Sequence, residues 1–212
     1  MNFRNNYWAF QNVLPHHLCN SIIRYALTKQ DQTALTGGTT NFKNLNQQRQ
    51  RNLFKQRNSK IVWLNDPWIY RYIMPFVAKA NINAGWNFQY DVSEQCQFTK
   101  YGEGQFYDWH CDSFDDPYGE RNQKNVSDEF KGKIRKLSVT VSLSDPNTYR
   151  GGELEFSFSG SPNQRPVTEE CKTILPKGSI VVFPSYVWHR VKPVLSGTRY
   201  SLVIWNCGNP FV

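Results

Sequence analysis

The chain has 212 residues with a formal net charge of +8, 39% hydrophobic residues and 15% aromatic residues, which excludes a disordered chain and fits a single domain over residues 1–212. Its five cysteines form no Cys-x-x-Cys pair, so a disulfide-dense secreted scaffold is excluded. The sequence begins without a signal-peptide pattern, and it has no run of about eighteen apolar residues that could span a membrane. We therefore expect a cytoplasmic protein with no membrane partner.

A short aromatic strand is predicted over residues 6–13, followed by a helix that opens at Leu14-Pro15. The apolar residues of this helix recur at spacings of three and four: Leu18, Ile22, Tyr25 and Ala26. His16 and His17 lie in its first turn without an acidic neighbour, so we expect both at the surface.

A second strand and helix are predicted over residues 61–64 and from Asp66-Pro67 to about Ala80. Asp66 is a favourable N-cap residue and Pro67 suits the first helical turn. Pro75 should kink this helix or divide it, because proline donates no backbone hydrogen bond.

Two polar segments flank these elements and the later strands. Asp31–Lys60 carries six basic residues and one acid, and it is interpreted either as a solvated loop or as a mobile arm over a binding site. Ser113–Arg135 has mixed charge with one proline and two glycines, and it is interpreted either as a lid or as an idle surface loop.

From residue 86 onward the apolar pattern has the period of two that is typical of strands. The predicted strands cover residues 86–90, 94–101, 106–110, 136–143, 153–158, 170–175, 179–183, 188–193 and 200–206. Many short strands separated by glycine and proline favour a β-sandwich or barrel. We expect a mainly β protein with helical support over about 1–85 and a β core over about 86–207.

His110 and Asp112 lie at the end of one predicted strand, two positions apart, and so project to the same face. An imidazole and a carboxylate are two of the three ligands in the 2-His-1-carboxylate site of non-haem Fe(II) oxygenases. A short His-x-Asp pattern also occurs by chance as a surface pair. A distant third ligand is required, and His189 is the remaining candidate because His16 and His17 are set aside.

Arg199 lies ten positions beyond His189, at the start of an apolar strand. A guanidinium that points into a barrel needs an anionic partner, and a small dicarboxylate chelated to the metal would satisfy it with two hydrogen bonds. The alternative is a structural ion pair with Glu153 or Glu155.

These motifs together resemble the 2-oxoglutarate and Fe(II)-dependent dioxygenase superfamily, in its prolyl 4-hydroxylase-like branch. The similarity extends from about Arg57 to Trp205. It is carried by Arg57-Asn-Ser-Lys-Ile-Val-Trp-Leu64, Gln97-Phe-Thr-Lys-Tyr101, His110-Cys-Asp112, Leu137–Leu154 with its Arg-Gly-Gly-Glu end, Pro176-Lys-Gly-Ser179, His189-Arg-Val-Lys-Pro193 and Gly197-Thr-Arg199.

The resemblance implies a double-stranded β-helix, or jelly-roll, core with helices on one side. It implies that His110, Asp112 and His189 bind iron and that Arg199 binds the distal carboxylate of 2-oxoglutarate. Tyr101 and Trp205 match residues of the cosubstrate pocket. Some relatives place a second tyrosine on the strand equivalent to 137–143, where this sequence offers only the hydroxyls of Thr140 or Ser142.

The implied activity is hydroxylation of prolyl residues in a peptide or protein, with Fe(II), 2-oxoglutarate and O2, and with ascorbate as a possible reductant. The alternatives are an oxygenase of the same class acting on nucleic acid or a small molecule, and a non-catalytic jelly-roll binding module. Nucleic-acid oxygenases of the superfamily usually carry a second arginine where this chain has Trp205. A non-catalytic descendant is expected to have lost a ligand or the arginine, and all four are present.

Overall fold

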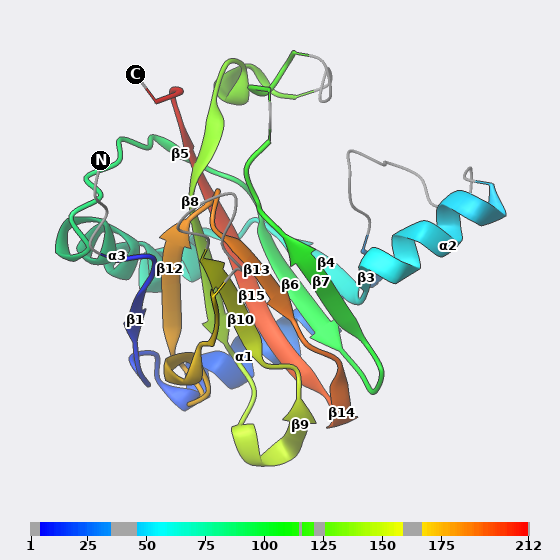
Figure 1. The fold of residues 1–212 in the computed structure, drawn as a ribbon. Coiled ribbons are helices and arrows are strands. Elements are labelled where there is room, and N and C mark those ends of the chain that lie inside the picture. Colours follow the sequence, from blue (N-terminus) through cyan, green and yellow to red (C-terminus); the bar gives the residue numbers. More distant parts are fainter. Residues whose placement is uncertain (1–4, 35–45, 115, 121–125, 159–166, 212) are drawn as a thin grey trace.

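The computed structural model describes residues 5–34, 46–114, 116–120, 126–158 and 167–211. Two antiparallel sheets face one another as the layers of a jelly roll, with helices beside the larger sheet (Figure 1). This arrangement confirms the predicted fold class. No helix within these described ranges combines the length and the apolar character that crossing a bilayer requires.

The larger sheet has the strand order β1-β12-β8-β15-β6-β4-β2, with β5 paired to β15. Its strands are β1 (Trp8–Phe10), β2 (Gln32–Thr33), β4 (Lys60–Leu64), β5 (Val92–Ser93), β6 (Cys96–Tyr101), β8 (Ile134–Ser142), β12 (Ile180–Pro184) and β15 (Arg199–Gly208). Strands from the N-terminal part of the chain therefore extend this sheet at both edges.

The smaller sheet has the order β11-β10-β13-β7-β3. Its strands are β3 (Arg57–Asn58), β7 (Phe106–His110), β10 (Leu154–Phe158), β11 (Val167–Glu170) and β13 (Trp188–Val191). A separate pair consists of β9 (Tyr149–Gly151) and β14 (Val194–Gly197).

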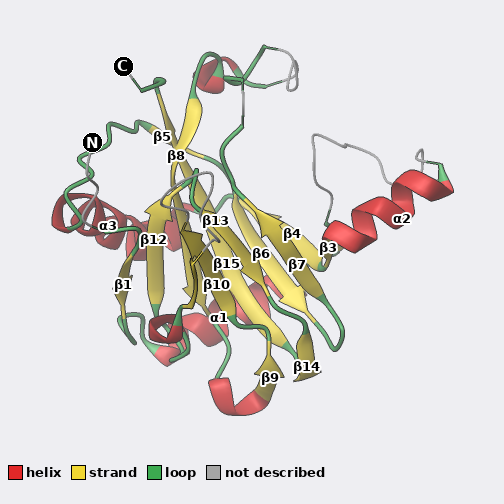
Figure 2. Ribbon diagram, in the orientation of Figure 1, coloured by secondary structure: helices red, strands yellow, loops and turns green. Residues whose placement is uncertain are grey.

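The described helices are α1 (His16–Leu27), α2 (Gln47–Gln56) and α3 (Pro67–Asn83), with 3-10 turns at Asp128–Phe130, Pro146–Thr148 and Lys172–Ile174. In Figure 2, α1 and α3 lie beside the larger sheet, whereas α2 projects away from the body of the molecule. Helix α2 has no buried residue, so the apolar core does not hold it in place.

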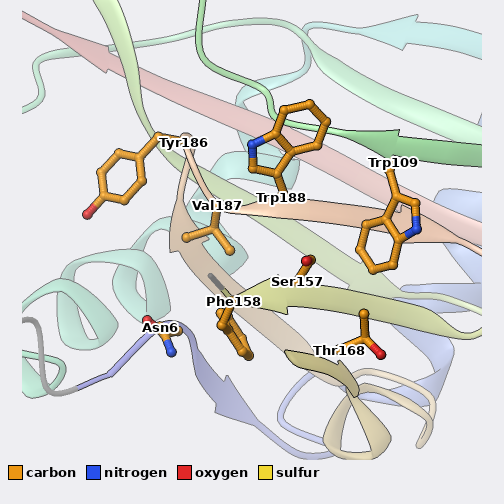
Figure 3. Close-up of a pocket in the computed structure, with 8 residues that line it drawn as sticks. All are labelled: Asn6, Trp109, Ser157, Phe158, Thr168, Tyr186, Val187 and Trp188. Carbon is orange, nitrogen blue, oxygen red and sulfur yellow. The ribbon is translucent and has the colours of Figure 1, made fainter. Parts of the chain in front are cut away.

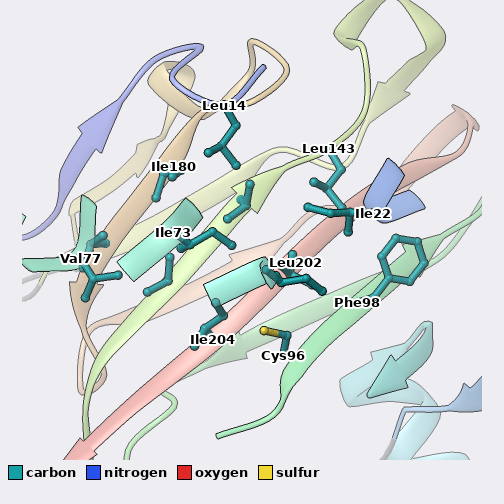
Figure 4. Close-up of a cluster of buried hydrophobic side chains, with 14 of the residues drawn as sticks. Leu14, Ile22, Ile73, Val77, Cys96, Phe98, Leu143, Ile180, Leu202 and Ile204 are labelled. Atoms are coloured by element: carbon teal, nitrogen blue, oxygen red, sulfur yellow. The ribbon is translucent and has the colours of Figure 1, made fainter. Parts of the chain in front are cut away.

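Alternation along the strands gives the larger sheet two different faces. On β8, Leu137, Val139 and Val141 join the apolar cluster that α1 and α3 cover. Figure 4 shows part of this cluster, including Ile22 of α1 and Ile73 of α3. The intervening Ser138, Thr140 and Ser142 are buried as well, on the face toward the smaller sheet. Each buried aliphatic side chain contributes about 1.5–3 kcal/mol, so the helical face stabilises the fold while the opposite face is left for polar groups.

A second apolar cluster fills the space between the two sheets. Phe156 of β10 and Phe183 of β12 are fully buried in it and meet edge to face, with ring centroids 5.0 Å apart. This packing joins the two layers beside the polar interior.

The predicted strand over residues 86–90 is wrong, because its backbone bonds to the end of α3. Asn81 accepts hydrogen bonds at its carbonyl from the amides of Trp86 and Asn87. Its side chain pairs with both backbone groups of Phe88, and Asn87 has φ +52°. The amides of residues 86–88 and the carbonyl of Phe88 are therefore not free to pair with a neighbouring strand.

The predicted strand over residues 170–175 is also wrong beyond its first residue. Strand β11 ends at Glu170, and the chain then forms the 3-10 turn at Lys172–Ile174. Cys171 and Ile174 are both buried, and a spacing of three suits such a turn rather than a strand.

Two further expectations concern α3 and the basic segment. Of the kink or division expected at Pro75, the division is not found, because α3 runs unbroken over Pro67–Asn83, with buried side chains on both sides of the proline, including Ile73 and Val77, in the apolar cluster. The basic segment Asp31–Lys60 is not a continuous loop, since β2, α2, β3 and the start of β4 lie within it. Residues 35–45 of that segment lie outside the described residues.

We expect Asn81→Ala to lower the free energy of unfolding by about 2–3 kcal/mol, because two buried hydrogen bonds to Phe88 are lost and backbone groups are left unpaired. Urea unfolding followed by circular dichroism measures the change. Asn83→Ala, at an exposed position of the same helix, is the matched control and should change stability by less than about 0.5 kcal/mol. Equal effects of the two substitutions would contradict this role of Asn81.

Candidate metal centre and cosubstrate pocket

Three side chains converge where the adjacent strands β7 and β13 pair. His110 and His189 are directly opposite one another in the antiparallel register, with ring centroids 4.1 Å apart. The carboxylate of Asp112 lies 3.7 Å from His110 Nε2 and 3.6 Å from His189 Nε2. All three ligand atoms lie within 4.8 Å of one another, so the residues are placed to hold one metal ion.

The ring orientation of both histidines is set by the backbone. His110 Nδ1 donates to the carbonyl of Asp108 at 2.8 Å, and His189 Nδ1 donates to the carbonyl of Val187 at 2.9 Å. Because a carbonyl only accepts, each imidazole carries its proton on Nδ1. The lone pair of each Nε2 then points toward Asp112, as metal binding requires.

Burial and the neighbouring charges keep the site in its ligand form. Burial, followed by the effect of His189, lowers the pKa of His110 from 6.5 to about 3. Burial opposes ionisation of Asp112, but the two imidazoles, Arg135 and a hydrogen bond from Ser138 hold the pKa of its carboxyl below the usual value. At neutral pH His110 therefore offers a neutral imidazole nitrogen and Asp112 offers a carboxylate.

The backbone of Asp112 is fixed by the turn that precedes β13. The amides of Asp112 and Ser113 both donate to the carbonyl of Ser185, at 2.8 and 2.9 Å. Arg135 Nη1 donates to the carbonyl of Asp112 at 3.3 Å. Asp112 Oδ2, however, is buried without a hydrogen-bond partner among the described residues. A buried carboxylate oxygen left in this state, 3.6 Å from His189 Nε2, fits a bound cation.

Arg199 lies on the inner face of β15, in the same pocket as the three ligands. It is only 4% exposed, and Nη1 donates to Ser201 Oγ at 3.2 Å. The ion pairs of Glu153 and Glu155 are with Lys192 and Arg190 instead. The alternative of a structural carboxylate partner is therefore not found among the described residues.

Space around Arg199 depends on Gly152. This glycine has φ +68°, and a Cβ at its position would lie 2.9 Å from Cδ of Arg199. The Arg-Gly-Gly-Glu motif therefore leaves room for the guanidinium beside the chain. A buried cation without an anion is costly, so the pocket fits a small anionic ligand.

The other predicted pocket residues line the same cavity. Tyr101 is paired with Arg199 across β6 and β15, and the guanidinium carbon lies 5.6 Å from its ring centroid. Thr140 and Trp205 also line the pocket, so the structure brings together all seven residues assigned to the site. Ser142, the alternative to Thr140, is buried beside β15 but does not line the cavity.

Sequence analysis assigned no site role to Arg57, Gln97 or Tyr107, which also line the pocket. Arg57 is buried, its guanidinium lies 4.4 Å from the ring centroid of Tyr107, and Nη2 has no hydrogen-bond partner among the described residues. Tyr107 in turn stacks on His110, with centroids 3.5 Å apart. The sequence does contain a signal for Arg57. It precedes the apolar strand β4, and Arg57, Ser59 and Ile61 are alternate residues that all turn inward.

Part of the segment Ser113–Arg135 is anchored beside the pocket. Tyr118 Oη donates to Glu94 Oε1 at 2.6 Å, and both carboxylate oxygens of Glu94 accept from Arg135. The guanidinium of Arg135 covers Trp205, with its carbon 4.0 Å from the ring centroid. The described part of this segment is thus tied to β8 and to the approach to β6.

The chain belongs to the 2OG-Fe(II) oxygenase superfamily, because the sequence model of that family matches residues 96–207, more than half of the chain. This confirms the resemblance inferred from the motifs. Members of this superfamily use Fe(II), 2-oxoglutarate and O2.

Curated relatives are named PKHD-type hydroxylases. One from Hyphomonas neptunium is 40% identical over 96 residues, covering 45% of this chain and 39% of the relative. One from Synechococcus sp. (strain CC9605) is 38% identical over 102 residues, covering 48% and 36%. The match spans about two fifths of the length of these relatives.

Solved structures with the same fold include a prolyl-4-hydroxylase from Pseudomonas putida, with a TM-score of 0.62, 22% identity, and coverage of 96% of this chain and 92% of that one. A prolyl hydroxylase from Trichoplax adhaerens, in complex with a hypoxia inducible factor peptide fragment, has a TM-score of 0.60, 15% identity and coverage of 96% and 84%. At these identities the likeness establishes the jelly-roll fold.

We expect the metal-free protein to lose stability as the pH falls below about 6.5. The pKa of His110 is about 3 in the fold and about 6.5 in the unfolded chain, so between these values the unfolded state binds more protons and the free energy of unfolding decreases with falling pH. The lowered pKa of Asp112 acts in the same direction at lower pH.

Urea unfolding in EDTA at pH 7, 6 and 5 measures this dependence. His110→Gln should flatten the slope by about 1 kcal/mol per pH unit below pH 6.5, while His17→Gln, at an exposed position, should keep the slope of the unmodified protein. The same slope in all three proteins would show that His110 is not held neutral by the fold.

Proposed function

We propose that this protein is an Fe(II)- and 2-oxoglutarate-dependent dioxygenase that hydroxylates prolyl residues in a peptide or protein. One observation carries the proposal. A single pocket contains two imidazole Nε2 atoms, a carboxylate oxygen without a hydrogen bond, and a buried arginine without a carboxylate partner among the described residues. A metal ion and a small dicarboxylate satisfy both sets of groups at once.

In this proposal His110, Asp112 and His189 hold Fe(II). When bound, the iron supplies the oxidative chemistry, in which 2-oxoglutarate and O2 give succinate and carbon dioxide while the substrate carbon gains a hydroxyl group. Arg199 binds the distal carboxylate of 2-oxoglutarate, with Ser201 orienting the guanidinium and Tyr101 and Thr140 beside it. The protein contributes position, charge and exclusion of water.

Prolyl hydroxylation is supported by the structural neighbours and by one wall of the pocket. Trp205 adds an aromatic ring to the lining of the pocket that holds the ligand atoms, which suits an apolar ring such as that of proline. The structural neighbours from Pseudomonas putida and Trichoplax adhaerens are prolyl hydroxylases. Nucleic acid is the less favoured substrate, because Trp205 stands where nucleic-acid oxygenases of the superfamily usually carry a second arginine.

The basic arm Asp31–Lys60 and the lid Ser113–Arg135 are proposed to grip the substrate chain. Gln56, at the end of α2, donates to the carbonyl of Trp109 at 3.0 Å, so the arm meets β7 next to His110. Tyr118 of the lid is bonded to Glu94. Both segments therefore reach the border of the pocket.

The direct test is incubation of the protein with Fe(II), 2-oxoglutarate, ascorbate and proline-containing peptides, with mass spectrometry for one added oxygen. We expect peptide mass gain coupled to succinate formation, and we expect His110→Ala to abolish both because a metal ligand is removed. His17→Ala is the control and should be active. Succinate without any peptide gaining oxygen would refute the peptide substrate, whereas no iron binding at all would refute the enzyme.

We expect Arg199→Ala to raise the KM for 2-oxoglutarate by about 100-fold, because charge-assisted hydrogen bonds worth about 3 kcal/mol are lost. Succinate formation at varied 2-oxoglutarate measures the change. Arg150→Ala removes an exposed arginine and is the matched control. Metal content should be the same in both variants, so a loss of iron in Arg199→Ala would contradict a role confined to the cosubstrate.

A further inference from the structure

A second cavity lies on the other side of the smaller sheet from the metal ligands. Trp109 and Trp188 directly precede His110 and His189, so alternation along β7 and β13 turns their indoles to the opposite face. Together with Phe158 and Tyr186 they surround a groove of about 650 Å³ (Figure 3). The function proposed above makes no use of this groove.

The described lining of the groove is largely aromatic. Of the eight described residues that line it, four are aromatic and none is Asp, Glu, Lys or Arg, although a fifth of the chain is charged. The nearest recorded charge is Arg190, whose guanidinium carbon lies 4.7 Å from the ring centroid of Trp109, and this arginine is already paired with Glu155. Trp188 is 52% exposed and Tyr186 is 39% exposed, and a cluster of accessible aromatic rings of this size indicates a binding surface rather than ordinary surface variation.

The uncharged lining favours an uncharged occupant. An acidic or basic segment would lose hydration in the groove without meeting an opposite charge. A proline-rich segment in polyproline II conformation presents flat apolar rings and unpaired backbone carbonyls. Indole N–H groups such as those of Trp109 and Trp188 can donate hydrogen bonds to such carbonyls.

The groove adjoins the metal site at the turn Ser185–Val187. The carbonyl of Ser185 accepts from the amide of Asp112, and the carbonyl of Val187 accepts from His189. The side chains of Tyr186 and Val187, from the same turn, line the groove. One turn therefore borders both the metal ligands and the groove.

We propose that this groove binds a proline-rich flank of the polypeptide substrate, as a docking site separate from the metal pocket. The inference rests on the proposed function and adds a substrate requirement to it. Polyproline II rises about 3.1 Å per residue, and packed sheets lie about 10 Å apart. The flank therefore begins at least about three residues from the hydroxylated proline.

The test compares three peptides with the same target sequence: a short peptide, one with a proline-rich flank, and one with a Gly/Ser flank of equal length. We expect the proline-rich flank to lower the KM about 10-fold relative to the other two, because a second attachment point raises the effective concentration at the metal pocket. A Gly/Ser flank that lowers the KM equally would overturn the inference.

Two variants assign the effect to the groove. Trp188→Ala removes an aromatic wall, and Thr168→Arg places a charge in the groove on β11, away from the strands that carry the ligands. Both should bring the ratio of KM values for the flanked and short peptides close to one. Tyr72→Ala, which removes an exposed aromatic ring on α3, should keep the 10-fold ratio. A ratio that survives Thr168→Arg would overturn the inference.

Binding of the flank peptide alone, followed by tryptophan fluorescence, separates this inference from the proposed function. Saturable binding that Thr168→Arg abolishes supports the groove, even if no peptide is hydroxylated and the enzyme proposal fails. Hydroxylation without binding of the flank peptide, and without a lower KM for the flanked peptide, would overturn the docking site in the groove. The enzyme proposal would not be affected.

Discussion

The site depends on the antiparallel pairing of β7 with β13, which places His110 directly opposite His189. Backbone carbonyls then orient each ring through Nδ1, so the ligand nitrogens face one point without help from side chains further away. Asp112 joins them because its amide is bonded to the turn that leads into β13. The two strands and this turn form one unit, and disturbing any part of it displaces all three ligand atoms.

The larger sheet has a different role on each face. Its outer face carries the apolar residues that α1 and α3 cover, and this burial supplies much of the stability. Its inner face carries Thr140, Arg199 and Ser201 among other polar groups, which are expensive to bury. The apolar packing of the outer face thus holds the inner polar groups in fixed positions, including Arg199, which is buried without a carboxylate partner among the described residues.

Local signals predicted the elements well where a strand or helix has one apolar and one polar face. These predictions were wrong where backbone groups form hydrogen bonds outside helices and sheets. Residues 86–90 have an alternating pattern, but their backbone groups bond to Asn81 at the end of α3. Helix α2 has no buried residue, so its sequence contains no apolar stripe by which a helix is usually recognised.

The sequence by itself determined the chemistry of the candidate site: the His-x-Asp pair, the later histidine and arginine, and the strand alternation that assigns each to a face. It also determined the fold class, since many short strands follow a helical N-terminal part. Only the tertiary structure decided which strands are neighbours, because pairing register joins residues far apart in the chain. That register placed Arg57 and Tyr107 beside His110, left Arg199 without a glutamate partner, and gathered Trp109 and Trp188 into one groove.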